Sequence, residues 1–532
     1  MTRSEALARL HDRSGAYDML VIGGGATGAA VALDAASRGY STALIERFDF
    51  GEGTSSRSTK LVHGGVRYLE QGNVPLVMEA LHERGILKQN APHLVSELAF
   101  IVPNYEWWEA PFYGIGLRLY DLLAGRYGFG QSRNLSREET LGVIPTLKTD
   151  GLRGGVVYYD GQFDDARLLI QMLATAAEQG AAAVNYCEAV AMLKGEDGFV
   201  DGVRVLDRES GHEYDLHARV VINATGAFSD GVRQLADPNA APMIAPSQGV
   251  HLVFDKSFLP SKSAILVPHT ADGRVMFAIP WHGHTLVGTT DTAVPEAPIE
   301  PVPFAGEIEF ILETAALYLD HAPSRSDILS AWAGIRPLVK AGGAGGTAAL
   351  SRDHSIHVDR NGLLTIAGGK WTTCRKMAED CVNQAGLLAG LPDRNCVTRS
   401  LRIHGFHHNA DQFGPLGVYG SDAIRIEDLI RQHPSLDTRL DAALPYTEAE
   451  AVFAIRHEMA RTLPDLLSRR LRALPLNARS ALRMAPRAAE LLAAELGRDP
   501  AWTSAQLAAF TQLAQGYLGS EPFPATAVSP HT

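Results

Sequence analysis

The sequence lacks the features that mark membrane-spanning, exported and metal-binding proteins. It has no apolar run of about 18 residues, the length from which a transmembrane helix is built. Residues 1–16 mix acidic and basic side chains and contain no apolar core of signal-peptide length, so we expect a cytoplasmic protein. The four cysteines form no CxxC pair and have no zinc-ligand spacing, which indicates free thiols and no metal site.

Positive charge is also scarce. The 532 residues carry a formal net charge of −12 with an isoelectric point near 5.9, and no basic patch stands out that would neutralise the phosphates of a nucleic acid. Hydrophobic residues make up 46% of the chain and charged residues 20%, which is typical of folded proteins. We therefore expect an enzyme of two or three domains that acts on small molecules and not on nucleic acid.

What the sequence does contain is a glycine-rich turn in the setting of a dinucleotide site. Residues 17–22 form an apolar strand, residues 23–28 (GGGATG) open a helix, and a second strand ends at Glu46. In this motif the glycines permit a tight turn, a close approach to a pyrophosphate and close helix packing, and the acid accepts from a ribose hydroxyl. We predict cofactor contacts at Gly23, Gly25, Ala26, Thr27, Gly28 and Glu46.

Two later turns of the same kind favour FAD over NAD. A strand at 219–224 runs into Thr225 and Gly226, and a strand at 363–367 runs into residues 368–373 (GGKWTT) and a helix. Open α/β sheets bind ligands at the carboxyl ends of their strands, and a helix N-terminus there stabilises the negative charge of a reduced flavin. The alternative is three unrelated strand-to-helix turns. On the FAD interpretation, further contacts are Ala224, Gly226, Gly368, Gly369 and Thr372.

The sequence pattern of the remaining chain changes at two places. Between residues 245 and 300, short β-like runs alternate with glycine and proline breaks, which predicts an antiparallel sheet inserted as a substrate domain. After about residue 400 the composition becomes rich in Ala, Leu and Arg. Thr447 and Glu450 form a capping box there, and the prolines at 464, 475 and 486 are expected to divide the region into several helices.

One segment has the composition of a membrane-surface helix. From Trp107 to Phe129, apolar residues recur at roughly helical spacing, with Arg118 and Arg126 among or beyond them. Aromatic anchors with basic residues suit a peripheral membrane contact. The alternative is a helix packed on its own domain.

Six segments along the chain share their residues with one known family. They are TSSRSTKLVHGGVRYLE at 54–70, GTTD at 288–291, GIRPL at 334–338, SRDH at 351–354, GGKWTT at 368–373, and EMARTLPD at 458–465 with Leu467, Arg469 and Arg470. Together they resemble the aerobic-type, FAD-dependent glycerol-3-phosphate dehydrogenases over nearly the whole chain.

The resemblance implies an α/β fold in three parts. These are a glutathione-reductase-like FAD-binding Rossmann domain (1–85, 155–235 and 350–395), an inserted antiparallel-sheet substrate domain of the D-amino-acid-oxidase type (86–154 and 236–349), and a helical C-terminal domain (400–532). It also implies oxidation of sn-glycerol 3-phosphate to dihydroxyacetone phosphate, with hydride transfer from C2 to FAD N5. A membrane quinone would receive the electrons, and the protein would lie peripherally on the inner face of the cell membrane.

The site residues follow from charge chemistry and from the resemblance together. Arginine binds phosphate bidentately, so Arg67, Arg336 and Arg352 are expected to clamp the substrate phosphate. His251 is the first candidate for the proton acceptor. The predicted catalytic residues are His251, Arg336 and Lys370. Tyr68, Thr290 and Lys370 are predicted to bind substrate with the arginines, and Thr54, Ser55, Ser56, Lys60, Leu61, His63 and Gly64 to contact the cofactor.

Three other functions stay open, and each has its own requirement. A glycerol-3-phosphate oxidase would pass electrons to oxygen. An amino-acid oxidase or dehydrogenase on this scaffold would need one arginine for a carboxylate and would not need a clamp of three. A non-catalytic flavin protein would bind FAD without reacting with any substrate. A homodimer is compatible with each function.

The sequence departs from the family in one place. Residues 341–346 (AGGAGG) replace a loop that is usually more polar in the family.

Overall fold

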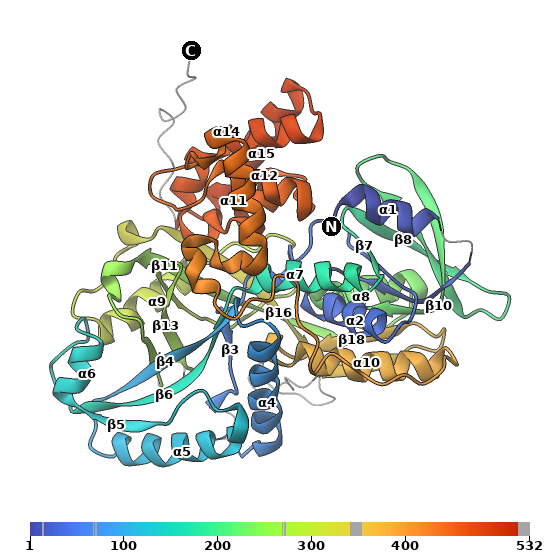
Figure 1. Ribbon diagram of the computed structural model, residues 1–532. Helices are drawn as coiled ribbons and strands as arrows, with labels where there is room; N and C mark the ends of the chain where they lie inside the picture. The colour runs from blue at the N-terminus through green and yellow to red at the C-terminus, as the bar shows by residue number, and fades with distance from the viewer. Residues whose placement is uncertain are drawn as a thin grey trace.

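In the described part of the chain, two β-sheets are capped by a layer of C-terminal helices (Figure 1). The computed structural model describes residues 1–12, 15–66, 69, 72–268, 270, 273–340 and 354–519. In the view of Figure 1 the two sheets lie side by side below, and the orange and red C-terminal helices lie above them.

The first sheet has eight strands with a parallel centre. Its main order is β17-β18-β10-β1-β2-β7, and β9 and β8 continue from β10 as an antiparallel extension. β1 is buried along nearly its whole length, as the continuous apolar run YDMLVI predicts for a central parallel strand. The strands are β1 Tyr17–Ile22, β2 Thr42–Ile45, β7 Ala182–Val184, β8 Cys187–Lys194, β9 Val200–Asp207, β10 Glu213–Asn223, β17 His354–Val358 and β18 Leu364–Gly368.

Helix α2 (Ala26–Ser37) packs closely against α7 (Asp165–Glu178) and α10 (Cys374–Leu388). Its buried positions are mostly alanine, and these small side chains let neighbouring helices approach. The other helices around this sheet are α1 Arg3–His11 and α8 Ser229–Ala236, with short helical turns at η1 Thr54–Ser56, η3 Gly226–Phe228 and η7 Trp371–Thr373.

The second sheet has ten strands and is mostly antiparallel. Its main order is β15-β11-β14-β13-β12-β4-β6-β3, with β16 on β11 and β5 on β6. The antiparallel pairing predicted for residues 245–300 is confirmed in β11–β14 and β12–β13–β14. The strands are β3 Leu61–Val62, β4 Val95–Asn104, β5 Arg133–Ser136, β6 Gly154–Phe163, β11 Ile244–Asp255, β12 Ala264–Val267, β13 Met276–Trp281, β14 His284–Gly288, β15 Thr292–Ala293 and β16 Ser330–Val339.

The strands β3 and β6 fall within the ranges expected for the nucleotide domain but belong to the second sheet. β6 pairs with β4 along its ten residues, and β3 pairs with β6. The physical reason is that the sequence of a strand does not reveal which strand it pairs with. Helices α4 Val74–Asn90, α5 Glu109–Ala124, α6 Arg137–Val143 and α9 Ala305–Tyr318 lie around this sheet.

The C-terminal region is helical, as predicted, and shares an apolar core with the second sheet. Leu466, Leu467 and Leu474 pack in one buried cluster with Trp281 and Trp332. Its elements are η8 Ala410–Asp422, α11 Ala423–Gln432, η9 Pro434–Asp437, α12 Glu448–His457, η10 Asp465–Arg470, α13 Ala473–Leu476, α14 Ala478–Leu496 and α15 Pro500–Gln515.

Two local predictions for this region have different outcomes. The capping box is confirmed, since the Thr447 side chain accepts from the Glu450 amide while the Glu450 side chain accepts from the Thr447 amide. The expected break at Pro486 is wrong, because α14 continues through it. Pro486 lies on the exposed face of this amphipathic helix, so water can bond the carbonyl left without a partner.

Candidate active site

A cavity of about 1000 Å³ lies at the carboxyl ends of β1, β10 and β18. All three glycine turns line it, which is where an open α/β sheet places its ligand. Of the predicted site residues, the cavity is lined by Gly23, Gly25, Ala26, Thr27, Glu46, Thr54, Ser55, Ala224, Gly226, Gly368, Gly369 and Lys370.

Close backbone contacts explain the glycines of the first turn. Gly23 has a φ of +111°, and a Cβ there would lie 2.7 Å from the Ala224 carbonyl oxygen. A Cβ on Gly28 would lie 1.9 Å from the Gly23 carbonyl oxygen, so only glycine lets α2 begin here. Gly25 is the N-cap residue of α2, and the Ser55 hydroxyl accepts from the Ala26 amide at 2.9 Å. The turn therefore brings a helix N-terminus to the cavity wall.

Glu46 lies where the ribose acceptor of a dinucleotide site is expected. Its carboxylate accepts hydrogen bonds from the Gly24 amide (2.7 Å) and the Phe48 amide (2.9 Å). Burial raises its pKa, and the nearby charges of Glu52 and Asp49 add to this effect. Together with the glycine turns and the size of the cavity, this acid suits a dinucleotide such as FAD.

Other predicted cofactor contacts are not among the lining residues of the cavity. Lys60 is fully buried, and its Nζ donates to Asp165 Oδ2 at 2.6 Å and to the Ser56 carbonyl at 2.8 Å. Burial lowers its pKa to about 7. The Thr372 hydroxyl accepts from the His63 amide at 3.1 Å. The predicted contacts outside the lining are Gly28, Ser56, Lys60, Leu61, His63, Gly64 and Thr372, and for them a cofactor contact stays a prediction.

His251 is buried on β11 and has a distinctive environment. Its Nε2 lies 2.9 Å from the Thr59 hydroxyl, and its ring stacks on Trp332 with centroids 4.4 Å apart. Its buried Nδ1 has no hydrogen-bond partner among the described residues. Burial, with the charges of Lys60 and Arg336, lowers its pKa well below the usual value. His251 is therefore neutral near pH 7, which a proton acceptor requires.

Arg336 lies on β16, across from β11. Its guanidinium donates to the carbonyls of Gln248 (3.3 Å) and Thr290 (3.0 Å) and lies 3.4 Å from the Asp291 carboxylate. The Arg336 side chain is 26% exposed. A second arginine, Arg274, donates to the Asp291 carbonyl at 2.6 Å, so two guanidiniums flank this aspartate.

The hydroxyl of Thr290 makes two hydrogen bonds within the protein. It accepts from the Val250 amide at 3.0 Å and donates to Glu307 at 2.9 Å. These hydrogen bonds connect Thr290 to β11 and to Glu307. They do not support the predicted contact of Thr290 with substrate, which stays a prediction. Arg67, Tyr68 and Arg352 lie outside the described residues, as does the glycine-rich segment 341–346.

The segment from Thr54 to Thr59 joins the parts of the site. Thr54 donates to the Ile335 carbonyl next to Arg336 (2.5 Å), and the Ser55 carbonyl accepts from the Trp371 indole next to Lys370 (2.9 Å). Thr59 then contacts His251. Thr59, Trp332 and Arg274 were not among the site residues predicted from the sequence. Thr59 lay within a motif already quoted, whereas Arg274 had no motif to mark it.

The described residues contain no group of three or more His, Cys, Asp or Glu side chains that could hold a metal ion. In the same part of the chain, no helix is both long enough and apolar enough to cross a membrane.

The fold and the cavity define an FAD-dependent oxidoreductase. Residues 18–375 match the family model described as FAD dependent oxidoreductase, and residues 415–503 match the model for the C-terminal domain of alpha-glycerophosphate oxidase. The chain is similar to the mitochondrial glycerol-3-phosphate dehydrogenase of Homo sapiens, with 43% identity over 519 residues that cover 91% of this chain and 71% of the human protein. The probable mitochondrial glycerol-3-phosphate dehydrogenase of Caenorhabditis elegans is 40% identical to this chain, and the alignment covers 98% of this chain and 75% of the nematode protein.

A solved structure supports the same assignment across the whole chain. The glycerol-3-phosphate dehydrogenase from Bacillus halodurans, complexed with FAD, has a TM-score of 0.79 and 27% identity and covers 99% of both chains. This chain belongs to the FAD-dependent glycerol-3-phosphate dehydrogenase family.

Proposed function

We propose that this protein oxidises sn-glycerol 3-phosphate to dihydroxyacetone phosphate and passes the electrons to a membrane quinone. Its relatives are named for this substrate. The observation that carries the proposal is the segment Thr54–Thr59, which borders the cavity and bonds to His251 and to the neighbours of Arg336 and Lys370. A cofactor cavity and candidate substrate groups thus meet along one piece of backbone.

In this proposal, different residues of the cavity bind different parts of the cofactor. The first glycine turn and the N-terminus of α2 would hold the pyrophosphate, and Glu46 would accept from the ribose. The turn at Gly368 and Gly369, with Lys370, would lie beside the flavin. When bound, FAD supplies the group that accepts the hydride from C2 of the substrate.

The protein's own residues bind the substrate and remove its proton. Arg336 carries a permanent charge in a partly exposed position, which suits the phosphate dianion. Arg67, Tyr68 and Arg352 complete the proposed phosphate site, with Lys370 toward the substrate oxygens. His251 is the proposed proton acceptor, because it is neutral near pH 7 and one of its ring nitrogens has no partner among the described residues.

Helix α5 supports the proposal of a membrane-bound acceptor. Trp108, Phe112, Ile115, Leu119 and Leu122 follow one another at helical spacing, and all of them are exposed. The opposite face of α5 packs into the apolar core of the second sheet through Leu117, Tyr120 and Ala124. In Figure 1 α5 lies at the lower edge of the molecule, on the side away from the C-terminal helices. We propose that this stripe lies on the inner face of the cell membrane.

One anaerobic experiment tests the proposed reaction. Oxidised protein is mixed with glycerol 3-phosphate, glycerol or D-amino acids while the flavin absorbance is recorded. Bleaching by glycerol 3-phosphate alone is the expected result. Bleaching by an amino acid would indicate an amino-acid oxidase, and no bleaching at all would indicate a non-catalytic flavin protein.

A second measurement separates the dehydrogenase from an oxidase. With glycerol 3-phosphate in air, we expect slow peroxide production without added acceptor and fast turnover when a quinone is present. Fast peroxide production without a quinone would assign oxygen as the acceptor and overturn this part of the proposal.

A further inference from the structure

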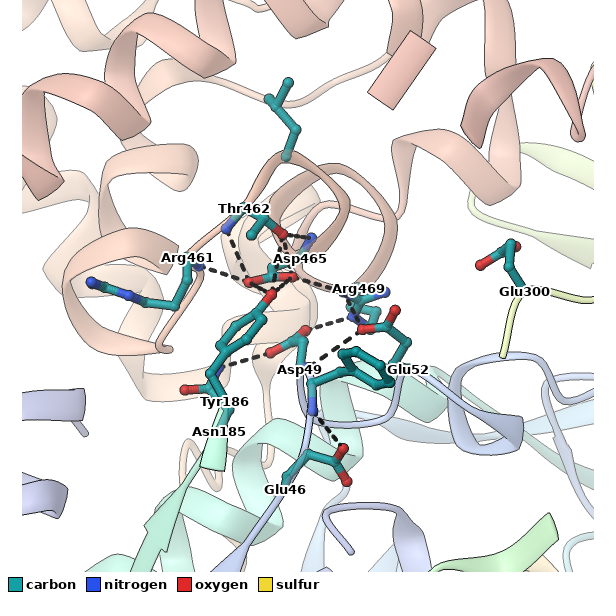
Figure 2. A network of polar contacts seen from close by, with 12 residues as sticks. Glu46, Asp49, Glu52, Asn185, Tyr186, Glu300, Arg461, Thr462, Asp465 and Arg469 are labelled. Atoms are coloured by element: carbon teal, nitrogen blue, oxygen red, sulfur yellow. Dashed lines mark hydrogen bonds and ion pairs between the residues drawn. The ribbon is translucent and has the colours of Figure 1, made fainter. Parts of the chain in front are cut away.

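The C-terminal helical region reaches the cofactor loop through two buried arginines, Arg469 and Arg470, and Figure 2 shows Arg469 beside Asp49 and Glu52. The loop consists of residues 46–53, between β2 and η1, and its Asp49 is completely buried. Arg470 binds the Asp49 carboxylate with two hydrogen bonds of 2.8 Å, and Arg469 Nε donates to the same carboxylate at 2.5 Å. Paired contacts of this kind are among the stronger polar interactions in proteins.

The cofactor loop needs these cations because it concentrates acidic residues. Glu46, Asp49 and Glu52 lie within one short stretch, and Glu46 and Glu52 line the cavity. Arg469 also lies 3.5 Å from the Glu52 carboxylate. Like charges at this spacing repel one another, and a buried carboxylate without a cation is costly.

The electrostatics of the loop show the effect of the two arginines. Burial alone would raise the pKa of Asp49, but Arg470 and Arg469 bring it to about 2. The charges of Asp49 and Glu52 in turn contribute to the raised pKa of Glu46. The charge of Asp49 therefore affects the pKa of Glu46, the residue proposed to accept a hydrogen bond from the cofactor ribose.

We propose that Arg469 and Arg470 are positioning residues for FAD: they neutralise Asp49 and hold the cofactor loop in the shape that presents Glu46 to the adenosine half of the cofactor. The inference rests on the proposed placement of FAD in the cavity. It gives the C-terminal helices a task in cofactor binding.

A neighbouring contact supports this role. Arg472, two residues beyond Arg470, donates to the Ser56 carbonyl at 3.2 Å and to Asp165 at 2.7 Å. The same short stretch of the C-terminal region therefore fastens both the cofactor loop and the segment that follows it.

The test measures FAD affinity in the full-length chain. FAD is removed and titrated back, and its fluorescence reports the dissociation constant. Arg470→Met is expected to weaken FAD binding tenfold or more. The control is Arg167→Met, which breaks a similarly buried pair with Glu458 (2.6 and 2.7 Å) that does not touch the loop. Arg470 contacts the backbone carbonyl of Glu458 (3.0 Å) and not its carboxylate, so this change leaves that hydrogen bond in place. We expect Arg167→Met to bind FAD within about twofold of the unmodified protein.

Thermal unfolding of the FAD-free variants separates positioning from general stability. Both variants are expected to lose stability, but only Arg470→Met is expected to lose FAD affinity. Equal FAD affinities for the two variants would overturn the inference. Where Arg470→Met gives no folded protein, Arg470→Lys and Arg167→Lys make the same comparison with milder changes.

A rescue variant tests the charge argument. Asp49→Asn added to Arg470→Met removes the unpaired charge and is expected to restore at least fivefold of the lost affinity. No rescue would contradict the neutralising role.

A third variant, Gly25→Val, tests the proposed placement of FAD separately. Gly25 lines the cavity, and a Cβ there would lie 3.0 Å from Ser55 Oγ, so valine crowds the first glycine turn. If Gly25→Val binds FAD normally, the placement of FAD is wrong. If Gly25→Val loses FAD while Arg470→Met matches Arg167→Met, only the positioning role is wrong.

Discussion

At the residue scale, Arg336 is the sharpest test of the substrate site. Replacing it with alanine removes the proposed charge-assisted contact with the phosphate, worth about 1.5–3 kcal/mol, so the KM for glycerol 3-phosphate is expected to rise about tenfold or more. Steady-state kinetics with a soluble quinone measure the change. FAD content is expected to stay constant, and Arg360→Ala, on an exposed arginine, serves as the control. An unchanged KM would remove Arg336 from the phosphate site.

Lys60 is buried, is not among the lining residues of the cavity, and influences the pKa of His251 through its charge. Its ammonium lies 4.6 Å from the Trp332 ring, on which His251 stacks, and its charge helps to lower the pKa of His251. Lys60→Met removes this cation, so the pKa of His251 is expected to rise. If His251 accepts the proton, the acid limb of the kcat/KM profile moves to higher pH by about half a unit or more.

The control for this shift is Lys88→Met, on a partly exposed lysine that pairs with Glu97. The Lys88 variant is expected to keep the original profile. A Lys60→Met profile that coincides with that of the unmodified protein would argue against His251 as the base, provided that the variant is folded and binds FAD.

At the scale of elements, α5 carries the membrane prediction. Ile115 is 72% exposed and Leu122 is 76% exposed, so Ile115→Glu and Leu122→Glu are expected to leave the fold intact. Each change removes apolar area worth about 1.5–3 kcal/mol when buried in lipid, so sedimentation with vesicles containing anionic lipid is expected to fall about tenfold. Leu387→Glu, at an 84% exposed leucine of α10, is the matched control. Equal sedimentation of all three variants would exclude α5 as the contact.

Elements with strong local signals were predictable from the sequence. The bounds of β1 agree with the strand predicted at residues 17–22, and the three glycine turns lie on one cavity because parallel strands bring their carboxyl ends together. Periodicity alone left two readings of α5, and the structure contains both a buried face and an exposed one.

Pairing between distant segments was not predictable. The membership of β6 in the second sheet depends on its partner β4, and the contact of Asp49 with Arg470 joins residues 421 positions apart. Neither the register of a strand nor the partner of a buried charge leaves a local pattern in one sequence. The division into domains at the predicted residues stays a prediction.

At the scale of the whole molecule, His404 joins the start of the C-terminal region to α7. Its Nδ1 lies 2.5 Å from Glu178, at the end of α7, and its Nε2 lies 2.7 Å from Asp422. The hydrogen bond with Asp422 raises the pKa of His404, and Glu178 adds to this effect while burial opposes it. The protonated imidazole therefore bonds the carboxylates of Glu178 and Asp422, and Arg425 lies 3.2 Å from the other oxygen of Asp422.

The sign of the pH dependence follows from the raised pKa of His404. Its contribution to stability is fully present below the unfolded pKa of about 6.5 and is lost as the pH rises through the higher folded value. His404→Gln is thus expected to lower the free energy of unfolding by about 1 kcal/mol at pH 6 and by less at pH 9. Thermal unfolding across this range measures the difference. His217→Gln, at a 56% exposed histidine, is the control variant. A constant difference between His404→Gln and the unmodified protein from pH 6 to 9 would show that the charge of His404 does not hold the C-terminal region to α7.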